Sequence, residues 1–441
     1  MHQKNGNGTF TSKIGFVLAA VGSAVGMGNI WMFPYRTGQY GGAAFLIPYL
    51  LFIALFGYVG LSGEFAFGRM TGTGPIGSYE FAMKSRGKKG GAILGTIPLL
   101  GSLGIAIGYA IIVGWVLRSA FGALTGSLMS TEPEQFFTEM SSTNFSSVPW
   151  HTLVILLTAA VLIFGVSGGI EKINKVMMPA FFILFIIIAV RVAFLPNAIE
   201  GYKYLLVPQW EYLFNPRTWI MAMGQAFFSL SVTGSGMIVY GAYLPKDEDV
   251  VDVAQHTALF DTIAAIVAAL VIIPACFAYG LDVGSGPSLL FVTLPTILQD
   301  VPLGRLFAVI LYIAMIFAGV SSLQNMFEAV AESLLNRFPK LSRTAVLILL
   351  GLLCLGFGLG MEPISKWGPW MDLVSIYIIP IGATLGAVSW FYVMKKDELL
   401  DAVNTGSGRT RGALWYGVGR YVYVPIAVVL CFVALFKHIS F

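Results

Sequence analysis

Charged residues are scarce in this sequence. Asp, Glu, Lys and Arg together make up 11% of its 441 residues, whereas 57% are hydrophobic. Soluble globular domains carry about 25% charged residues, and so many apolar side chains would need a core larger than any single soluble fold builds. An ordinary soluble protein is therefore excluded. The net charge is only +4, and no basic and aromatic patch indicates a nucleic-acid partner.

Cysteine and histidine are also rare, and neither forms a cluster. Cys276, Cys354 and Cys431 lie in apolar stretches without the spacing of a disulfide or a metal site, and the four histidines are dispersed. A zinc or iron centre would need grouped His and Cys ligands. The sequence also has no GxxxxGK[ST] phosphate-binding loop and no Ser/His/Asp or Cys/His grouping. It therefore predicts neither an ATP-driven pump nor an enzyme.

Long apolar runs dominate what remains. A helix needs roughly 20 residues to cross a bilayer, and about eleven runs approach or exceed that length. The sequence predicts an all-α membrane protein with about 11 transmembrane helices. Residues 1–11 are polar and precede the first run directly, so we expect no cleavable signal peptide. The expected spans are residues 12–37, 42–70, 90–125, 150–166, 174–195, 217–245, 252–281, 303–337, 343–360, 370–395 and 414–436.

The loops between these runs alternate in charge, which predicts their orientation. One set is rich in Lys and Arg, for example Lys84, Arg86, Lys88 and Lys89, whereas residues 126–149 carry three Glu and no Lys or Arg. Basic loops stay on the cytoplasmic side. We therefore expect a multi-pass protein of the cell membrane, embedded in the lipid bilayer, with a cytoplasmic N-terminus.

One loop is too apolar to be a solvated linker. Residues 287–295 read PSLLFVTLP. Such a run either folds back over the outer mouth of the protein as a lid or packs as an ordinary loop against the helix ends. The sequence favours neither alternative.

Two glycine- and serine-rich clusters interrupt the first and sixth apolar runs. They are residues 22–29, GSAVGMGN, and residues 229–236, SLSVTGSG. Helix breaks free backbone groups at membrane depth, which is tolerated only beside protein or a polar cavity. Paired breaks in two halves of a chain point to a transport site near the bilayer midplane. We therefore expect one transporter domain, residues 1–441, with an inverted five-plus-five repeat (residues 12–195 and 217–395) and an extra helix at 414–436.

Oxygen ligands gather around these breaks. Asp261 lies inside the apolar seventh run, where a carboxylate needs a cation or a network of donors. It is interpreted as a sodium ligand or counter-charge, and the alternative is a carboxylate bonded to a neighbouring helix. Ser321 and Ser322 in the eighth run could likewise be ligands or could bond back to their own helix.

A substrate carboxylate would suit the first break. The amides of Met27 and Gly28 begin a half-helix, and a helix N-terminus binds anions. Carbonyls freed at the second break could accept an ammonium group. Tyr109 could donate its hydroxyl to the carboxylate, although a core tyrosine bonded to a backbone carbonyl is the alternative.

Several motifs resemble one known family. Residues 26–34, GMGNIWMFP, followed by residues 41–45, GGAAF, resemble the first-span signature of the neurotransmitter:sodium symporters. Matches continue in residues 64–69, 165–179, 219–243, 291–295 and 317–322, so that the resemblance covers essentially the whole chain. It implies the fold of the bacterial leucine transporter, in which helices 1 and 6 are broken and the half-helix ends form the transport site.

The resemblance implies two sodium ions and a substrate site. The first sodium ion would bind Ala24, Asn29, Ser229, Asp261 and the substrate carboxylate. The second would bind Gly22, Val25, Ala318, Ser321 and Ser322. The substrate would contact Ala24, Met27, Gly28, Tyr109, Phe228, Ser229, Ser231 and Met326. Animal members need chloride near the first sodium ion, and because Asp261 supplies a fixed negative charge there, we expect no chloride requirement.

The resemblance also implies gates. Gly169 and Pro179 bracket nine residues, as in the family motif for local unwinding of the fifth span, although a helix start with a proline kink is the alternative. Met32 replaces an arginine that pairs with a tenth-span acid, here Asp372, and we hypothesise that Arg36 takes over that pairing.

At the inner end, Asn7 and Asn336 replace an arginine–aspartate pair, so that neutral hydrogen bonds and Phe10 would close the gate. Gly234 replaces a second pocket aromatic residue, which predicts a roomier or differently shaped pocket.

The sequence as a whole predicts a sodium-coupled secondary symporter. Its substrate would be a small zwitterionic amine, foremost a hydrophobic or aromatic amino acid, taken up by alternating access. The alternatives are a proton-coupled amino-acid transporter that uses Asp261, and a substrate-gated sodium channel or sensor.

Overall fold

The computed structural model describes residues 9–284, 286 and 288–438, and in these ranges the protein is built from helices joined by turns. Seven helices are long and apolar enough to cross a membrane, and the bent pair Lys13–Ala24 and Gly28–Gln39 makes an eighth span. The helices Val148–Ile163 and Arg343–Gly358, with the broken pair Pro216–Ser229 and Gly236–Tyr243, complete the eleven spans that the sequence predicts. The all-helical membrane fold is therefore confirmed.

The spanning segments agree with the expected ones to within several residues. In chain order they are α1 (Lys13–Ala24), η1 (Gly28–Met32) and α2 (Phe33–Gln39); α3 (Ala43–Leu55), η2 (Phe56–Leu61) and α4 (Ser62–Thr71); α6 (Gly91–Thr125); α9 (Val148–Ile163); η3 (Val166–Glu171) and α10 (Lys172–Ala193); α13 (Pro216–Ser229) and α14 (Gly236–Tyr243); α15 (Val250–Tyr279); α17 (Gly304–Arg337); α18 (Arg343–Gly358); α19 (Ile364–Asp372), η5 (Leu373–Ile378), α20 (Ile379–Val388) and η6 (Ser389–Val393); α22 (Ala413–Val418), η7 (Gly419–Tyr423) and α23 (Val424–Lys437).

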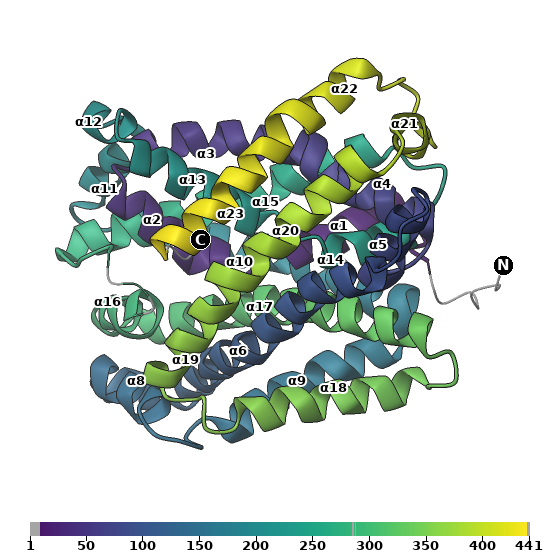
Figure 1. Ribbon diagram of the computed structural model, residues 1–441. Coiled ribbons are helices and arrows are strands. Elements are labelled where there is room, and N and C mark those ends of the chain that lie inside the picture. The colour runs from purple at the N-terminus through teal and green to yellow at the C-terminus, as the bar shows by residue number, and fades with distance from the viewer. Residues whose placement is uncertain (1–8, 285, 287, 439–441) are drawn as a thin grey trace.

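Short helices lie in the connections. They are α5 (Pro75–Lys84), α7 (Ser127–Ser130), α8 (Pro133–Ser141), α11 (Ala198–Leu206), α12 (Trp210–Leu213), η4 (Leu289–Thr293), α16 (Leu294–Asp300) and α21 (Lys396–Asn404). Figure 1 shows α8, α11, α12 and α16 at one end of the bundle, and α5 and α21 at the other. These ends are called the α16 end and the α5 end.

The first break lies where the sequence places it. Helix α1 ends at Ala24, and Val25 adopts an extended conformation with φ −70° and ψ 108°. The chain resumes in the π-helical turn η1 and continues into α2, with a bend of 58° between the two half-helices. Such π-helical turns are frequent at functional sites.

The second break separates α13 from α14. Residues 230–235 have no helical hydrogen-bond ladder, and two of them, Ser231 and Gly234, have positive φ angles of 52° and 73°. A positive φ is uncommon outside glycine and marks a backbone held by its surroundings. Both predicted interruptions are thus present, on helices that belong to opposite halves of the chain.

The broken helices lie inside the bundle, where neighbouring helices can satisfy the freed backbone. Helix α1 packs against α10, α15 and α17, while α14 packs against α4 and α17 and α13 packs against α3. Helices α6 and α17 run along each other beneath them (Figure 1). The periphery exposes large apolar side chains, such as Ile183, Leu352 and Phe436, which suits a lipid environment.

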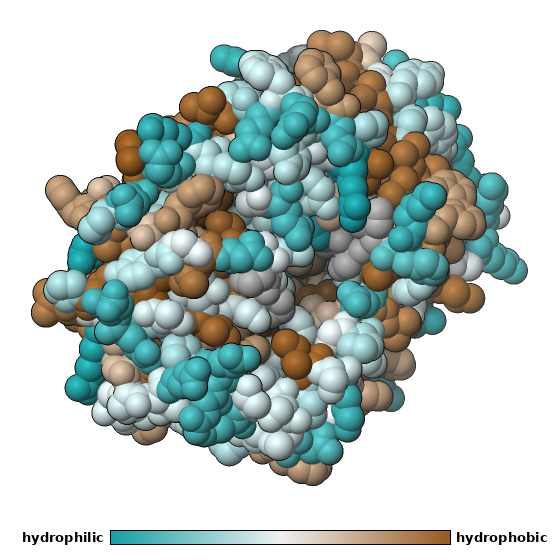
Figure 2. Space-filling view, turned by 90° about the vertical axis from the view of Figure 1, so that its left-hand side faces the viewer, coloured by the Kyte–Doolittle hydropathy of each residue, from teal (hydrophilic) through white to brown (hydrophobic). Residues whose placement is uncertain are grey.

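The apolar loop that begins at residue 287 forms a packed element. Residue 287 itself lies outside the described residues. The chain that follows folds into η4 and α16, which packs on α17, and the ring of Phe291 stacks on that of Phe137 with 5.1 Å between centroids. The described segment therefore packs against helix ends, which was one of the two alternatives. Figure 2 shows the α16 end, with many hydrophilic residues around a central hollow.

Candidate functional site

Asp261 links the two breaks through hydrogen bonds. Its side chain is fully buried in α15. The Asn29 Nδ2 group, just after the first break, donates to Asp261 Oδ1 at 2.8 Å, and the Ser229 hydroxyl, at the end of α13, donates to Oδ2 at 2.7 Å. The structure thus brings together three of the four residues predicted for the first sodium ion. The carboxylate is bonded to neighbouring helices, which was the alternative interpretation, and its role as a sodium ligand or counter-charge stays a prediction.

This buried carboxylate has no basic partner within the described ranges. The ion pairs of those residues do not include Asp261. The fourth predicted ligand, the carbonyl oxygen of Ala24, accepts no hydrogen bond from any residue that the structure describes. A buried charge is retained where a counter-ion or a metal ion compensates it. Oxygen ligands alone suit a hard cation such as sodium.

The five residues predicted for the second sodium ion also come together. The Ser322 hydroxyl reaches across from α17 and lies 3.4, 3.3 and 3.2 Å from the carbonyl oxygens of Gly22, Ser23 and Val25. Ser321 instead donates to Ala318 in its own helix at 2.9 Å. The two serines therefore behave differently: Ser321 is back-bonded, while Ser322 faces the freed carbonyls of α1.

Asn174 borders this second group and was missed by the sequence analysis. From α10 it donates through Nδ2 to Ile170 O and to Gln324 Oε1, both at 2.9 Å. Its Oδ1 atom would lie 2.4 Å from a Cβ atom added to Gly22, and none of the described residues donates to it. The sequence did contain a signal for this contact, because Asn174 and Gln324 are amide side chains within apolar spans.

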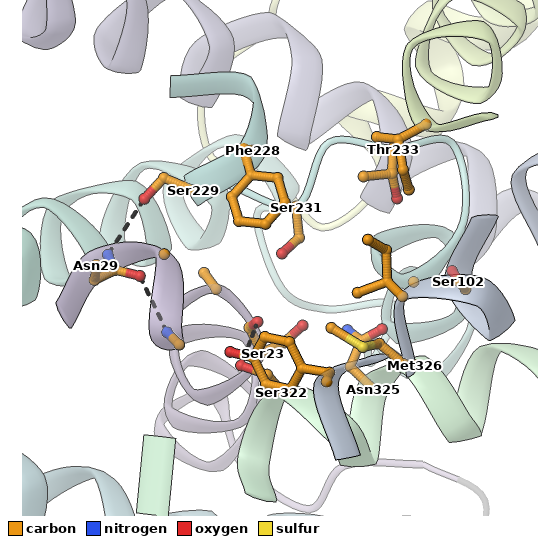
Figure 3. A pocket seen from close by; sticks show the side chains of 17 residues that line it. Ser23, Asn29, Ser102, Phe228, Ser229, Ser231, Thr233, Ser322, Asn325 and Met326 are labelled. Carbon is orange, nitrogen blue, oxygen red and sulfur yellow. Dashed lines mark hydrogen bonds between the residues drawn. The ribbon is translucent and has the colours of Figure 1, made fainter. Parts of the chain in front are cut away.

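A cavity lies between the two breaks. Of the residues predicted to bind substrate, all except Met27 line it, namely Ala24, Gly28, Tyr109, Phe228, Ser229, Ser231 and Met326. Figure 3 shows Asn29 and Ser229 on one side of the cavity, and Ser102, Thr233 and Asn325 on the other. The cavity wall carries hydroxyl, amide and backbone groups but no Lys, Arg, Asp or Glu side chain among the described residues.

Met27 contributes through its backbone. Its amide donates to the Tyr109 hydroxyl oxygen at 2.7 Å, so that the O–H of Tyr109 remains able to donate to a ligand. Gly26 packs tightly beside this pair, because an added Cβ atom would lie 2.3 Å from Tyr109 Oη and 2.7 Å from Ser322 Oγ. Only glycine fits where the substrate cavity and the second cation group meet.

The second break is held by Glu64. The amide of Gly234 donates to Glu64 Oε1 at 2.7 Å, and its carbonyl accepts from Tyr79 at 3.2 Å. An added Cβ atom on Gly234 would lie 2.4 Å from Tyr79 Oη, and Gly234 does not border the cavity. The prediction that this glycine makes the pocket roomier is therefore not supported, since no side chain would fit there.

The hypothesised outer pair is not formed in this conformation. Arg36 is buried in α2, and its Nη1 atom lies 3.7 Å from Met221 Sδ. Asp372 is at the end of α19, and the ion pairs of the described residues do not include Arg36 with Asp372. Arg36, Trp31 and Met32 line an open hollow at the α16 end. The pairing stays a prediction.

At the α5 end, Phe10 is buried as expected. Its ring meets Phe16 and Tyr240 edge-on at 5.0 and 5.8 Å, and its amide donates to Tyr243 O at 3.2 Å. Asn7 lies outside the described residues, and Asn336 is exposed near the end of α17. The contact between the two asparagines stays a prediction.

The segment between Gly169 and Pro179 is helical here and holds the start of α1. Gly169 lies in η3 and Pro179 lies inside α10. Glu171, between them, accepts from Thr11 N at 2.7 Å, from Thr11 Oγ1 at 2.6 Å and from Ser12 Oγ at 3.0 Å. Unwinding near Gly169 would therefore release the first turn of α1, whose end forms the second cation group.

A buried ion pair near this end escaped the sequence analysis. Arg343 binds both carboxylate oxygens of Glu328, at 3.1 Å from Nη1 to Oε1 and through Nη2 to Oε2, and its Nε atom donates to Leu162 O at 2.7 Å. Tyr243 donates to Glu328 Oε1 at 2.7 Å. The cluster joins α14, α17, α18 and the end of α9. The sequence signal for this ion pair was Glu328, an acidic residue inside the eighth apolar run.

We expect Glu328→Gln to loosen the α5 end. Removing the charge opposite a largely buried arginine costs several kcal/mol, and Tyr243 also binds Phe10. Hydrogen exchange at the amides of residues 10–16 should accelerate about thirtyfold, the equivalent of roughly 2 kcal/mol of local stability. The control is Glu200→Gln, which removes an exposed pair with Lys203. Equal exchange in both variants would count against this role.

Comparison with known proteins identifies the family of this chain. Residues 7–147 and 138–440 match the sequence model of the "Sodium:neurotransmitter symporter family". The "Uncharacterized sodium-dependent transporter YhdH" of Bacillus subtilis is 35% identical, over 98% of both chains. An uncharacterized sodium-dependent transporter of Haemophilus influenzae is 26% identical, over 97% of both chains.

A solved structure has the same fold. The crystal structure of MhsT in complex with L-phenylalanine superposes with a TM-score of 0.87 at 32% identity, and it covers 98% of this chain and 100% of MhsT. Animal transporters are more distant: the "Sodium- and chloride-dependent glycine transporter 2" of Xenopus laevis is 25% identical, over 89% of this chain and 60% of its own length.

Proposed function

The chain belongs to the sodium:neurotransmitter symporter family, and from this premise we propose that it takes up a hydrophobic or aromatic amino acid together with two sodium ions and without chloride. It is a membrane transporter and not an enzyme. The observation that carries the proposal is the fully buried Asp261 carboxylate, which binds Asn29 and Ser229 across both breaks. A sodium ion beside it would neutralise the charge and tie the half-helices together.

The cavity suits a zwitterion. A substrate carboxylate would meet the Tyr109 hydroxyl and the first sodium ion, and its ammonium group would meet carbonyl oxygens freed at the second break. The apolar side chains of Phe228, Ile105 and Met326 on the wall suit a hydrophobic or aromatic side chain. MhsT, which binds L-phenylalanine, shares the fold.

The second cation group suggests how release is coupled to conformation. Ser322 binds carbonyls at the end of α1, and Glu171 binds the start of the same helix. Loosening of the fifth span near Gly169 would free α1 and hydrate this site. Ligands that favour one conformation shift the population toward it, so that binding from outside and release inside follow from one moving helix.

The orientation follows from charge. The N-terminal residues described here, α5 and α21 lie at the same end of the bundle (Figure 1), and the basic loops around Lys84–Lys89 and Lys395–Lys396 adjoin α5 and α21. We propose that this end is cytoplasmic. The hollow at the α16 end, lined by Arg36 and Trp31, would then be the outer vestibule.

Uptake into proteoliposomes tests the function. We expect purified protein to accumulate labelled amino acids such as phenylalanine or leucine under an inward sodium gradient, with sigmoidal dependence on sodium. Replacing chloride with gluconate should leave the rate unchanged. Replacing sodium with choline at fixed pH should abolish it, whereas proton coupling through Asp261 would survive. Currents that do not saturate with substrate, or binding without flux, would instead indicate a channel or a sensor.

A further inference from the structure

The cavity has a polar end opposite the proposed sodium site. Figure 3 places Asn29 and Ser229 at one side, and Ser102, Thr233 and Asn325 at the other. At this far side the hydroxyls of Ser102 and Ser235 lie 2.7 Å apart. A purely hydrocarbon side chain of the substrate would offer the polar groups of this wall no hydrogen bond. Buried polar groups normally have at least one hydrogen-bond partner.

The first turn of α14 adds backbone donors to this end. Helix α14 begins at Gly236, a cavity residue, and no side chain caps it. The amides of Ile238 and Val239 already donate to Ser235 O at 3.1 and 3.4 Å, which leaves those of Gly236 and Met237 without an acceptor among the described residues. The first amides of a helix have no partner within it and are available to a ligand oxygen.

Asn325 is the second, independent sign of a ligand. Its side chain extends from α17 into the cavity wall and is 4% exposed. It packs against the start of α14, because a Cβ atom added to Gly236 would lie 1.9 Å from Asn325 Oδ1. Within the described part of the chain its Nδ2 group has no hydrogen-bond partner. A buried amide donor of this kind calls for an acceptor.

The rest of the wall limits what that acceptor can be. No acidic or basic side chain of the described residues borders the cavity, which disfavours a charged group because its charge would remain unpaired. Ile105, Phe228 and Met326 form an apolar wall. A ligand side chain that matches both parts has an apolar body and a neutral polar tip.

We propose that Asn325, together with the first turn of α14, binds the polar tip of an aromatic amino-acid side chain, so that the preferred substrate class is that of tyrosine rather than that of phenylalanine. The phenol oxygen accepts from Asn325 Nδ2 and the α14 amides, and its O–H donates to a serine hydroxyl. This inference depends on the proposed function, since it assumes an amino acid whose carboxylate lies at the opposite end.

Tyrosine and phenylalanine form a matched pair, because they differ by one hydroxyl. Sodium-dependent binding to the purified full-length protein, measured by calorimetry, should favour L-tyrosine at least about tenfold, since a site built for a substrate hydroxyl rejects the analogue that lacks it. In Asn325→Leu, which keeps the branched shape of the side chain and removes its polar atoms, the ratio should fall to about one while L-phenylalanine binding is retained. Gln135→Leu removes an exposed carboxamide on α8 and should keep the wild-type ratio.

Each outcome decides the matter. A wild-type protein that binds phenylalanine as well as tyrosine overturns the inference and leaves the proposed function intact, and this result needs no variant. A tyrosine preference that survives Asn325→Leu also overturns it. If neither amino acid, nor any other, binds in the presence of sodium, the proposed function itself fails. If Asn325→Leu does not fold, Ser102→Ala must lower the ratio several-fold for the inference to stand.

Discussion

Asp261→Asn is expected to lose sodium-driven uptake in chloride-free medium by roughly two orders of magnitude, the equivalent of about 3 kcal/mol for a buried charge left without its counterpart. The substitution keeps the shape of the side chain and an oxygen that can accept from Asn29, while Ser229 must turn to accept from the new amide group, and it removes the negative charge. A sodium ion entering this buried site would then carry an uncompensated positive charge. Initial uptake rates measured against sodium concentration would show the loss as a weaker apparent affinity.

Chloride distinguishes a lost charge from a damaged site. If the Asp261 carboxylate serves as the fixed anion, chloride in the medium should partly restore uptake by Asp261→Asn. The uptake rate of the wild-type protein should not depend on chloride. Glu134→Gln, an exposed carboxylate on α8, is the control for charge alone. A variant with wild-type sodium dependence at zero chloride would contradict the proposal.

The two breaks could be predicted because their cause is local. Each contains glycines and small polar residues within an apolar run, and neither composition nor periodicity there supports a continuous helix. Asp261 and the serine pair were equally visible, since ionisable and polar residues are costly at membrane depth. The resemblance to a family then supplied the ligand sets, which geometry brings together around the breaks.

The contacts that hold the ends of the bundle could not be predicted in the same way. Glu328 lies 15 residues from Arg343 and 85 residues from Tyr243 in the chain, and their meeting depends on how four helices pack. The same holds for Asn174 and Gln324, which lie 150 residues apart. The sequence shows that each residue is unusual within an apolar run, but not which partner satisfies it.

The Arg36–Asp372 hypothesis shows a related limit. Helical spacing places Arg36 one turn beyond Met32, and that reasoning assumes a regular helix. The π-helical turn η1 ends at Met32 and Pro34 follows it. The side chains beyond this turn therefore point in other directions than regular α-helical spacing would give them. Arg36 points into a buried environment beside Met221.

Ser322→Ala should remove one of the two sodium ions from the coupling. The Ser322 hydroxyl faces three carbonyl oxygens at 3.2 to 3.4 Å, and a single O–H can donate fully to only one of them. The other oxygens stay underbonded, which favours a cation beside them. We expect the Hill coefficient for sodium to fall from about two towards one, and the apparent sodium affinity to fall about tenfold, or roughly 1.4 kcal/mol.

The neighbouring serine makes this test specific. Ser321 donates to Ala318 O within α17, so Ser321→Ala frees that carbonyl for a cation and should weaken sodium binding less than Ser322→Ala does. Thr158→Val removes a buried hydroxyl that is bonded back to Val154 in α9, remote from the breaks, and should leave the Hill coefficient unchanged. Of the three substituted residues, only Ser322 reaches the carbonyls freed at the end of α1. Equal losses in all three variants would therefore mean that lost packing, rather than a lost sodium ligand, accounts for the effect.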